Sequence, residues 1–205
     1  LNLARQVSPL AQTSKYRREL DMLLSAGERI SMSLLSMALS DLGLKCRSLT
    51  GSQSGIITDT SHGEARIHEI KAFRIEESLA QGEIVIVAGF QGVSREKEIT
   101  TLGRGGSDTT AVALGVALKA DEVFIYTDVS GFMSADPRTV PLAFVHEELD
   151  STLAYVGASR GAQVLHPRCI EIAAKNNLTL WVKNTFDASK TGTCIKELKM
   201  NKLEG

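Results

Sequence analysis

LGRGGSDTTAVALGVALKADEVFIYTD, residues 102–128, joins a glycine-rich turn to a helix rich in Ala, Val and Leu and then to an apolar strand. A second apolar run, EIVIVAGF at residues 83–90, is typical of a strand covered on both faces. Buried strands that alternate with helices indicate an α/β sandwich around a largely parallel sheet. The sequence therefore predicts an α/β fold.

Hydrophobic spacing places the other elements around this stretch. Two helices are expected at residues 14–25 and 28–42, with Gly27 ending the first of them. The polar segment 91–100 is expected to form a hairpin region. Further strands are predicted at residues 45–50, 55–58, 65–70, 121–128 (buried) and 178–184, and further helices at residues 74–81, 151–156 and 162–175.

Bulk composition narrows the functional class. The chain of 205 residues is 43% hydrophobic and 23% charged, as in soluble globular proteins, and its net charge is −1. That balance gives no electrostatic footprint for nucleic acid, and no apolar run approaches the roughly 20 residues that a membrane helix needs. The three cysteines and four histidines lack metal-ligand spacing, so no metal-ligating residue is predicted. A cytoplasmic enzyme without a nucleic-acid or membrane partner fits these numbers best.

The strongest chemical signal is the motif GRGGSD at residues 103–108. Its glycines let backbone N–H groups approach an anion closely, and the following helix adds the positive end of its dipole. Arg104 offers a two-pronged fork to a carboxylate or a phosphate. A glycine turn with Ser107 or Asp108 capping the helix is the structural alternative, although it does not explain the arginine. The motif does not match the P-loop pattern GxxxxGK[ST]. It does not match GxGxxG either, because Asp108 stands where the third glycine belongs.

A second signal follows the strand at residues 121–128. Thr127 and Asp128 end this strand, and ligands of open α/β sheets bind outside the carboxyl ends of strands. Asp128 and, in the loop beyond, Asp136 are candidates for ribose or magnesium contacts, and Arg138 is a candidate for a phosphate contact. The alternative is a solvated loop with an Asp-Pro turn.

Glu28 is a third candidate, for a different ligand. Its carboxylate could bind the ammonium group of a substrate. At the expected start of the helix 28–42 it would equally favour the helix dipole without any ligand.

Six segments together resemble the catalytic domain of aspartate kinases, a branch of the amino-acid kinase family. The resemblance extends from about Glu19 to Ile195 in unbroken order. The segments are DMLLSAGERIS (21–31), LTGSQSGI (49–56), IVAGFQGV (86–93), TTLGRGGSDTTAVAL (100–114), IYTDVSGFMSADPR (125–138) and GAQVLHPRCIEIA (161–173).

This resemblance implies a fold, a reaction and a domain plan. The fold is a three-layer αβα sandwich with a mainly parallel central sheet, and the reaction transfers the γ-phosphoryl group of ATP, with Mg²⁺, to the β-carboxylate of L-aspartate. Residues 1–196 would be the catalytic domain, with residues 1–100 mainly binding the amino acid and residues 101–196 mainly binding ATP. Residues 197–205 would be a tail or the start of a linker to regulatory ACT domains. A homodimer is expected on family grounds.

The resemblance also assigns roles to individual residues of the amino-acid site. Glu28 would hold the substrate ammonium group, and Arg104 would clamp a substrate carboxylate, supported by Gly105 and Gly106. Ser107 would lie near both nucleotide and substrate. Asp108 would organise a catalytic lysine, so Arg104 and Asp108 are the expected catalytic residues.

The nucleotide site is assigned in the same way. Thr127 and Asp128 would contact the adenosine end of ATP, with Phe132 standing where the family usually has tyrosine. Asp136 and Arg138 would complete the phosphate site.

The sequence departs from the family pattern at two places. The first strand and its lysine-bearing glycine loop are expected upstream of Leu1. Gln163 stands where the family usually has a lysine that reaches the ATP phosphates, which predicts weaker ATP binding or slower transfer. A catalytically silent member that only binds a ligand or a partner is therefore the alternative to an enzyme. A sister kinase for glutamate or acetylglutamate is a third possibility.

Overall fold

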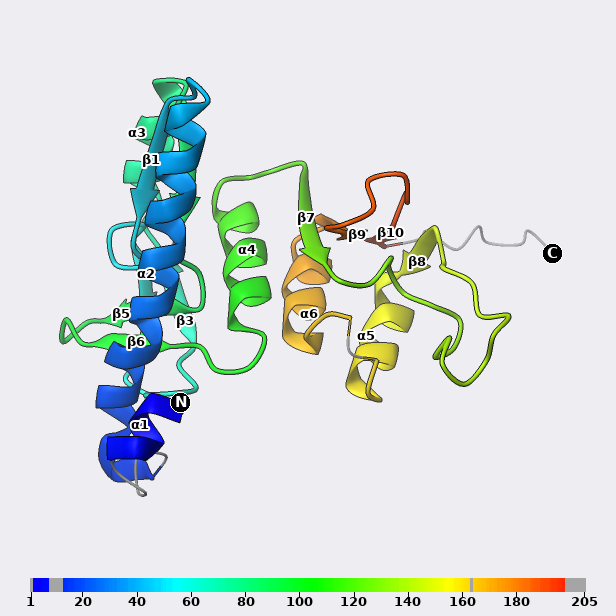
Figure 1. Ribbon diagram of the computed structural model, residues 1–205, viewed down its shortest axis with the longest axis horizontal. Helices are drawn as coiled ribbons and strands as arrows, with labels where there is room; N and C mark the ends of the chain where they lie inside the picture. The colour runs from blue at the N-terminus through cyan, green and yellow to red at the C-terminus, as the bar shows by residue number, and fades with distance from the viewer. Residues whose placement is uncertain (1, 8–12, 163, 198–205) are drawn as a thin grey trace. The chain divides into compact units, whose positions relative to one another are not determined.

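The computed structural model describes residues 2–7, 13–162 and 164–197. The chain forms two compact units, Leu1–Thr110 and Ala111–Gly205, and the boundary falls within helix α4, Gly106–Ala117. Figure 1 labels most of the helices and strands of both units. Among the described helices, none is long and apolar enough to cross a membrane.

One long helix dominates the first unit. After the short helices α1 (Asn2–Val7) and η1 (Ser14–Tyr16), α2 extends without interruption over Arg17–Asp41. The prediction of two helices separated at Gly27 is wrong. A glycine inside a helix costs only about 1 kcal/mol, and the buried residues on either side of it, Ser25 and Met32, belong to the same packed face.

The strands of the first unit form two sheets. Strand β1 pairs in parallel with β4, and the second sheet has the order β3-β2-β5-β6. Their bounds are β1 Cys46–Leu49, β2 Ile56–Thr58, β3 Ile67–Ile70, β4 Ile84–Val87, β5 Gln91–Ser94 and β6 Ile99–Thr101, with helix α3 at Phe73–Ala80. The predicted hairpin region is confirmed by the antiparallel pairing of β5 with β6. Strand β4 is not covered on both faces as predicted, since Ile84 is 41% exposed.

The second unit is a four-stranded sheet of order β7-β9-β10-β8. Helices α5 and α6 lie against each other and against this sheet (Figure 1). The elements are β7 Glu122–Thr127, β8 Glu148–Asp150, α5 Ser151–Ser159, α6 Pro167–Lys175, β9 Thr179–Asn184 and β10 Thr193–Lys196. Their apolar side chains, with Val112 of α4, Ile170, Leu180 and Val182 among them, form one buried cluster.

Two predictions for the second unit need correction. Helix α6 begins at Pro167 rather than at residue 162, because Pro167 suits the first helical position and the His166 side chain accepts a hydrogen bond from the N–H of Arg168. Strand β7 is not buried on both faces. Its side chains alternate, with Phe124 and Tyr126 exposed and the intervening residues partly covered.

The pairing pattern agrees with the predicted sheet. Of the seven strand pairings among the described residues, four are parallel. Strands β8 and β10 were not predicted, and they pair in parallel with each other.

Candidate functional site

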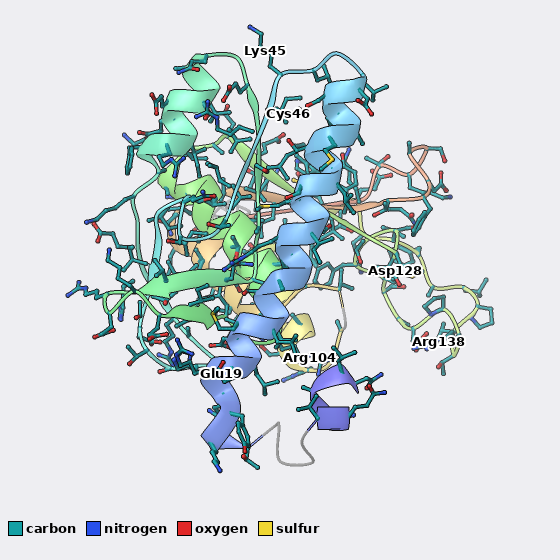
Figure 2. All side chains as sticks on the ribbon, turned by 60° about the vertical axis from the view of Figure 1, so that its left-hand side comes forward. Glu19, Lys45, Cys46, Arg104, Asp128 and Arg138 are labelled. Atoms are coloured by element: carbon teal, nitrogen blue, oxygen red, sulfur yellow. The ribbon has the colours of Figure 1, made fainter. Side chains whose placement is uncertain are left out.

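A cavity of about 260 Å³ lies in the first unit beside helix α2. Its wall combines apolar side chains with four polar side chains and the backbone of the glycine turn. Figure 2 shows Arg104 next to the N-terminal half of α2. The lining residues are Arg17, Leu20, Asp21, Leu24, Gly63, Phe90, Thr101, Gly103 and Arg104.

The glycines that precede α4 are required by the local geometry. Gly103 has φ +73°, and a Cβ there would lie 2.9 Å from the carbonyl oxygen of Gly63. A Cβ on Gly106 would lie 2.8 Å from Cδ2 of Phe90. These close approaches hold the turn flat against its neighbours and leave Arg104 as its protruding side chain.

Helix α4 begins at Gly106, which makes Gly105 its N-cap residue. Ser107 and Asp108 therefore lie inside the first turn, and the prediction that one of them occupies the N-cap position is wrong. An acidic residue in a first turn still interacts favourably with the helix dipole.

Arg104 has the properties expected of an anion clamp. Its side chain is exposed and borders the cavity. Within the described chain its guanidinium has neither a hydrogen-bond partner nor an ion-pair partner. A guanidinium that is not already paired can give its full fork to a ligand carboxylate.

Glu28 lies in the middle of α2, half-buried. The suggestion that it serves the dipole at a helix start is therefore wrong. It follows Leu24 by four residues and Asp21 by seven, so it continues the face of α2 that lines the cavity. Among the described residues its carboxylate has no partner. Its carboxylate is therefore available to a cationic group.

The sequence reasoning missed Phe90, which borders the same cavity. Its backbone is left-handed, with φ 67°, a conformation that a bulky residue rarely adopts. The hydroxyl of Thr110 accepts a hydrogen bond from the N–H of Phe90 at 3.0 Å, and the carbonyl of Phe90 accepts one from Leu102 at 2.9 Å. The signal that was available is the pattern GFQG between two strands, where glycines flank a strained aromatic residue.

Most of the predicted nucleotide residues belong to the second unit, whereas Ser107 belongs to the first. Thr127 ends β7, which is parallel to β9, and its hydroxyl donates to the carboxylate of Asp128 at 3.2 Å. Asp136 and Arg138 pair with each other in the loop beyond, and Figure 2 shows Arg138 on the outer part of that loop. In the described chain no hydrogen bond joins the first pair to the second.

Two other nucleotide predictions are placed differently. Phe132 is 4% exposed and belongs to the buried cluster of the second unit, while its backbone N–H donates to Thr193 Oγ1 at 2.9 Å. Any contact of Phe132 with a nucleotide would thus involve little of its ring. Gln163 lies outside the described residues.

The ion pair of Asp136 with Arg138 shifts the pKa of both side chains. The hydrogen bonds that Arg138 donates hold the pKa of Asp136 below its ordinary value, and the same bonds raise the pKa of Arg138. Both side chains therefore stay charged at neutral pH. Across the described ranges, no three His, Cys, Asp or Glu side chains converge on a point that could hold a metal ion.

Comparisons with known proteins identify the family of this chain. A model of the amino acid kinase family matches residues 2–184. An aspartokinase of Mycolicibacterium smegmatis is 50% identical over 197 residues, which are 96% of this chain and 46% of that protein. The chain thus spans about half the length of the curated relatives it matches.

Solved structures give the same likeness. An aspartate kinase from Synechocystis superposes with a TM-score of 0.80 at 43% identity, covering 98% of this chain and 32% of that one. Aspartokinase III of E. coli, in complex with aspartate and ADP, superposes with a TM-score of 0.86 at 29% identity, covering 98% of this chain and 45% of that one. The resemblance to aspartate kinases and the predicted αβα fold are confirmed by these matches. The chain belongs to the amino acid kinase family.

Proposed function

We propose that this chain is the catalytic region of an aspartate kinase, which transfers the γ-phosphoryl group of MgATP to the β-carboxylate of L-aspartate. The observation that carries the proposal is the cavity bordered by Arg104, with Glu28 further along the same face of α2. A cation fork and a carboxylate without partners are complementary to an amino acid that carries an ammonium group and carboxylates. The identity to aspartokinases supports the choice of aspartate.

The chemistry is consistent with the residue types at this site. An aspartate carboxylate is already ionised at neutral pH, so the nucleophile needs no general base. The acceleration must come from orienting two anionic substrates and from stabilising charge on the transferred phosphoryl group. In this proposal Arg104 neutralises one substrate charge and Gly105 presents its backbone N–H group. Gly106, whose N–H donates to the Gly103 carbonyl, supports the turn by its close packing against Phe90. Ser107 and Asp108 act at the start of α4.

The nucleotide would be held by the second unit. Thr127 and Asp128 stand at the carboxyl end of a parallel strand, the usual position for a ligand in such sheets. Arg138 would meet a phosphate and Asp136 would orient it. Mg²⁺ would arrive with ATP and keep phosphate and water ligands, because it seldom occupies a cage made by protein alone. The E. coli relative solved with aspartate and ADP supports this pair of substrates.

Several expectations remain predictions within this proposal. They are the catalytic domain at residues 1–196 with its two binding halves, the linker to ACT domains, the homodimer and the cytoplasmic location. Contacts of Phe132 and Gln163 with ATP are also predictions.

The experiment that tests the function is ADP release by the full-length protein with MgATP and an amino-acid panel. L-Aspartate should drive ADP release, and hydroxylamine should trap the acyl phosphate as a hydroxamate. Preferential turnover of L-glutamate or N-acetyl-L-glutamate would instead indicate a sister kinase. Silence with every amino acid, while aspartate still binds, would indicate a binding protein of this family.

A further inference from the structure

Asp21 is a buried carboxylate for which the proposed reaction has no use. Its side chain is 0% exposed, and it lies in α2 one turn before Ser25. Three groups donate to it: Nδ1 of His62 at 2.7 Å, the backbone N–H of Gly63 at 3.1 Å and the hydroxyl of Thr101 at 2.5 Å. The carboxylate therefore joins α2 to the loop after β2 and to the end of β6.

Burying a carboxylate costs free energy, and so does removing the hydrogen bonds that a buried carboxylate makes. A buried charge is tolerated only when hydrogen bonds replace its water, and here three donors do so. Removing the acceptor would leave the buried Thr101 hydroxyl and the partly buried Gly63 N–H without a partner. The arrangement consequently restricts α2 to one position against these two segments.

The restricted segments are the ones that carry the substrate clamp. Arg104 follows Thr101 by three residues, and Gly103 packs against the carbonyl of Gly63. Glu28 follows Asp21 by two helical turns on the same face of α2. The loop is further tied to β6 by the hydrogen bond from Ala65 N–H to the Thr101 carbonyl, 2.9 Å long.

We propose that Asp21 is a positioning residue that, through His62 and Thr101, fixes Glu28 and Arg104 relative to each other for the amino-acid substrate. This inference rests on the proposed function. It assigns Asp21 no contact with the reacting atoms. Loss of this positioning should therefore weaken the use of the amino-acid substrate and leave the use of MgATP unchanged.

The test uses Asp21→Asn in the full-length protein, with steady-state kinetics for both substrates. The KM for L-aspartate should rise about tenfold or more, while the KM for MgATP stays within about twofold. Asp59→Asn is the matched control. Asp59 lies in the same loop and accepts hydrogen bonds from Ser61 and Arg66, but none from α2 or β6, so its variant should keep the wild-type KM for aspartate.

Thr101 supplies a second pair of variants in case Asp21→Asn does not fold. Thr101→Val removes the hydroxyl at nearly the same volume, and Thr101→Ser keeps it. The valine variant should raise the KM for aspartate clearly more than the serine variant does.

Each outcome decides the matter. Equal losses for both substrates, or an unchanged KM for aspartate in Asp21→Asn and Thr101→Val, would overturn the inference while the wild type remains an active kinase. A wild type that releases no ADP with aspartate would overturn the proposed function first, and the inference with it.

Discussion

The guanidinium of Arg138 and the carboxylate of Asp136 engage each other on two sides, with Nη2 2.8 Å from Oδ2 and Nε 3.0 Å from Oδ1. The backbone N–H of Arg138 adds a third hydrogen bond to Oδ1, 2.9 Å long. Two residues assigned to the phosphate site thus neutralise each other within one short turn. A phosphate that binds Arg138 has to share the guanidinium with this carboxylate.

The pair predicts an acid-shifted titration of Asp136. Because the Arg138 hydrogen bonds lower its pKa in the folded state, Asp136 favours folding above the ordinary aspartate pKa. That contribution is lost as the pH falls through the lowered value. Arg138→Gln should return the pKa of Asp136 towards normal, as measured by carboxyl carbon NMR during an acid titration. Asp187, whose pKa is lowered by Ser189, is the internal control and should not move.

Arg104 is expected to act through its fork as well as its charge. Losing a charge-assisted hydrogen bond costs about 1.5–3 kcal/mol, so Arg104→Gln should raise the KM for L-aspartate by roughly 10- to 150-fold. Arg104→Lys should recover only part of this loss, because lysine is a point charge without the planar fork. Arg66→Gln removes an exposed arginine of the same unit that does not line the cavity, and it should leave the KM unchanged. An equal effect of the two glutamine variants would contradict the assignment.

Glu28 provides a prediction that separates binding from folding. Because its carboxylate has no partner among the described residues, Glu28→Gln should change the free energy of unfolding by less than about 0.5 kcal/mol. The affinity for L-aspartate, measured by titration calorimetry, should nevertheless fall about tenfold or more. Asp41→Asn at the end of the same helix is the control and should leave the affinity unaltered. A stability loss without an affinity loss would instead make Glu28 a structural residue.

Local patterns predicted the longer elements, because apolar spacing and turn residues are properties of short segments. Strands β8 and β10 were missed although strands as short as β2 were predicted. Strand β8 obtains its pairing from β10, which lies far along the chain, as Cys194 opposite Glu148 shows, and β10 pairs on its other edge with β9. For helix α2 the sequence predicted a boundary that does not exist. Gly27 has the chemistry of a helix end, but packing on both sides of it keeps the helix continuous.

In the candidate site too, some residues could be predicted from the local sequence and others could not. Arg104 could be found from sequence because an arginine among glycines has no structural explanation of its own. Asp21 and Phe90 could not be nominated from their neighbours in the chain, since their roles depend on His62, Thr101 and Thr110. The hydrogen bonds that define a buried site join residues that the sequence separates.

Two glycines test whether this account of α2 and of the turn before α4 is right. No atom outside the local helix backbone lies within 4 Å of a Cβ built on Gly27, so Gly27→Ala should stabilise the protein by roughly 0.5–1 kcal/mol through helix propensity. A Cβ on Gly106 would lie 2.8 Å from Phe90 Cδ2 and 3.0 Å from Leu102 Cβ, so Gly106→Ala should destabilise by about 1–3 kcal/mol. Urea denaturation of the two variants beside wild type measures both changes. If Gly27→Ala destabilised the protein, α2 would be broken at Gly27 in solution, and Glu28 would again stand at the start of a helix.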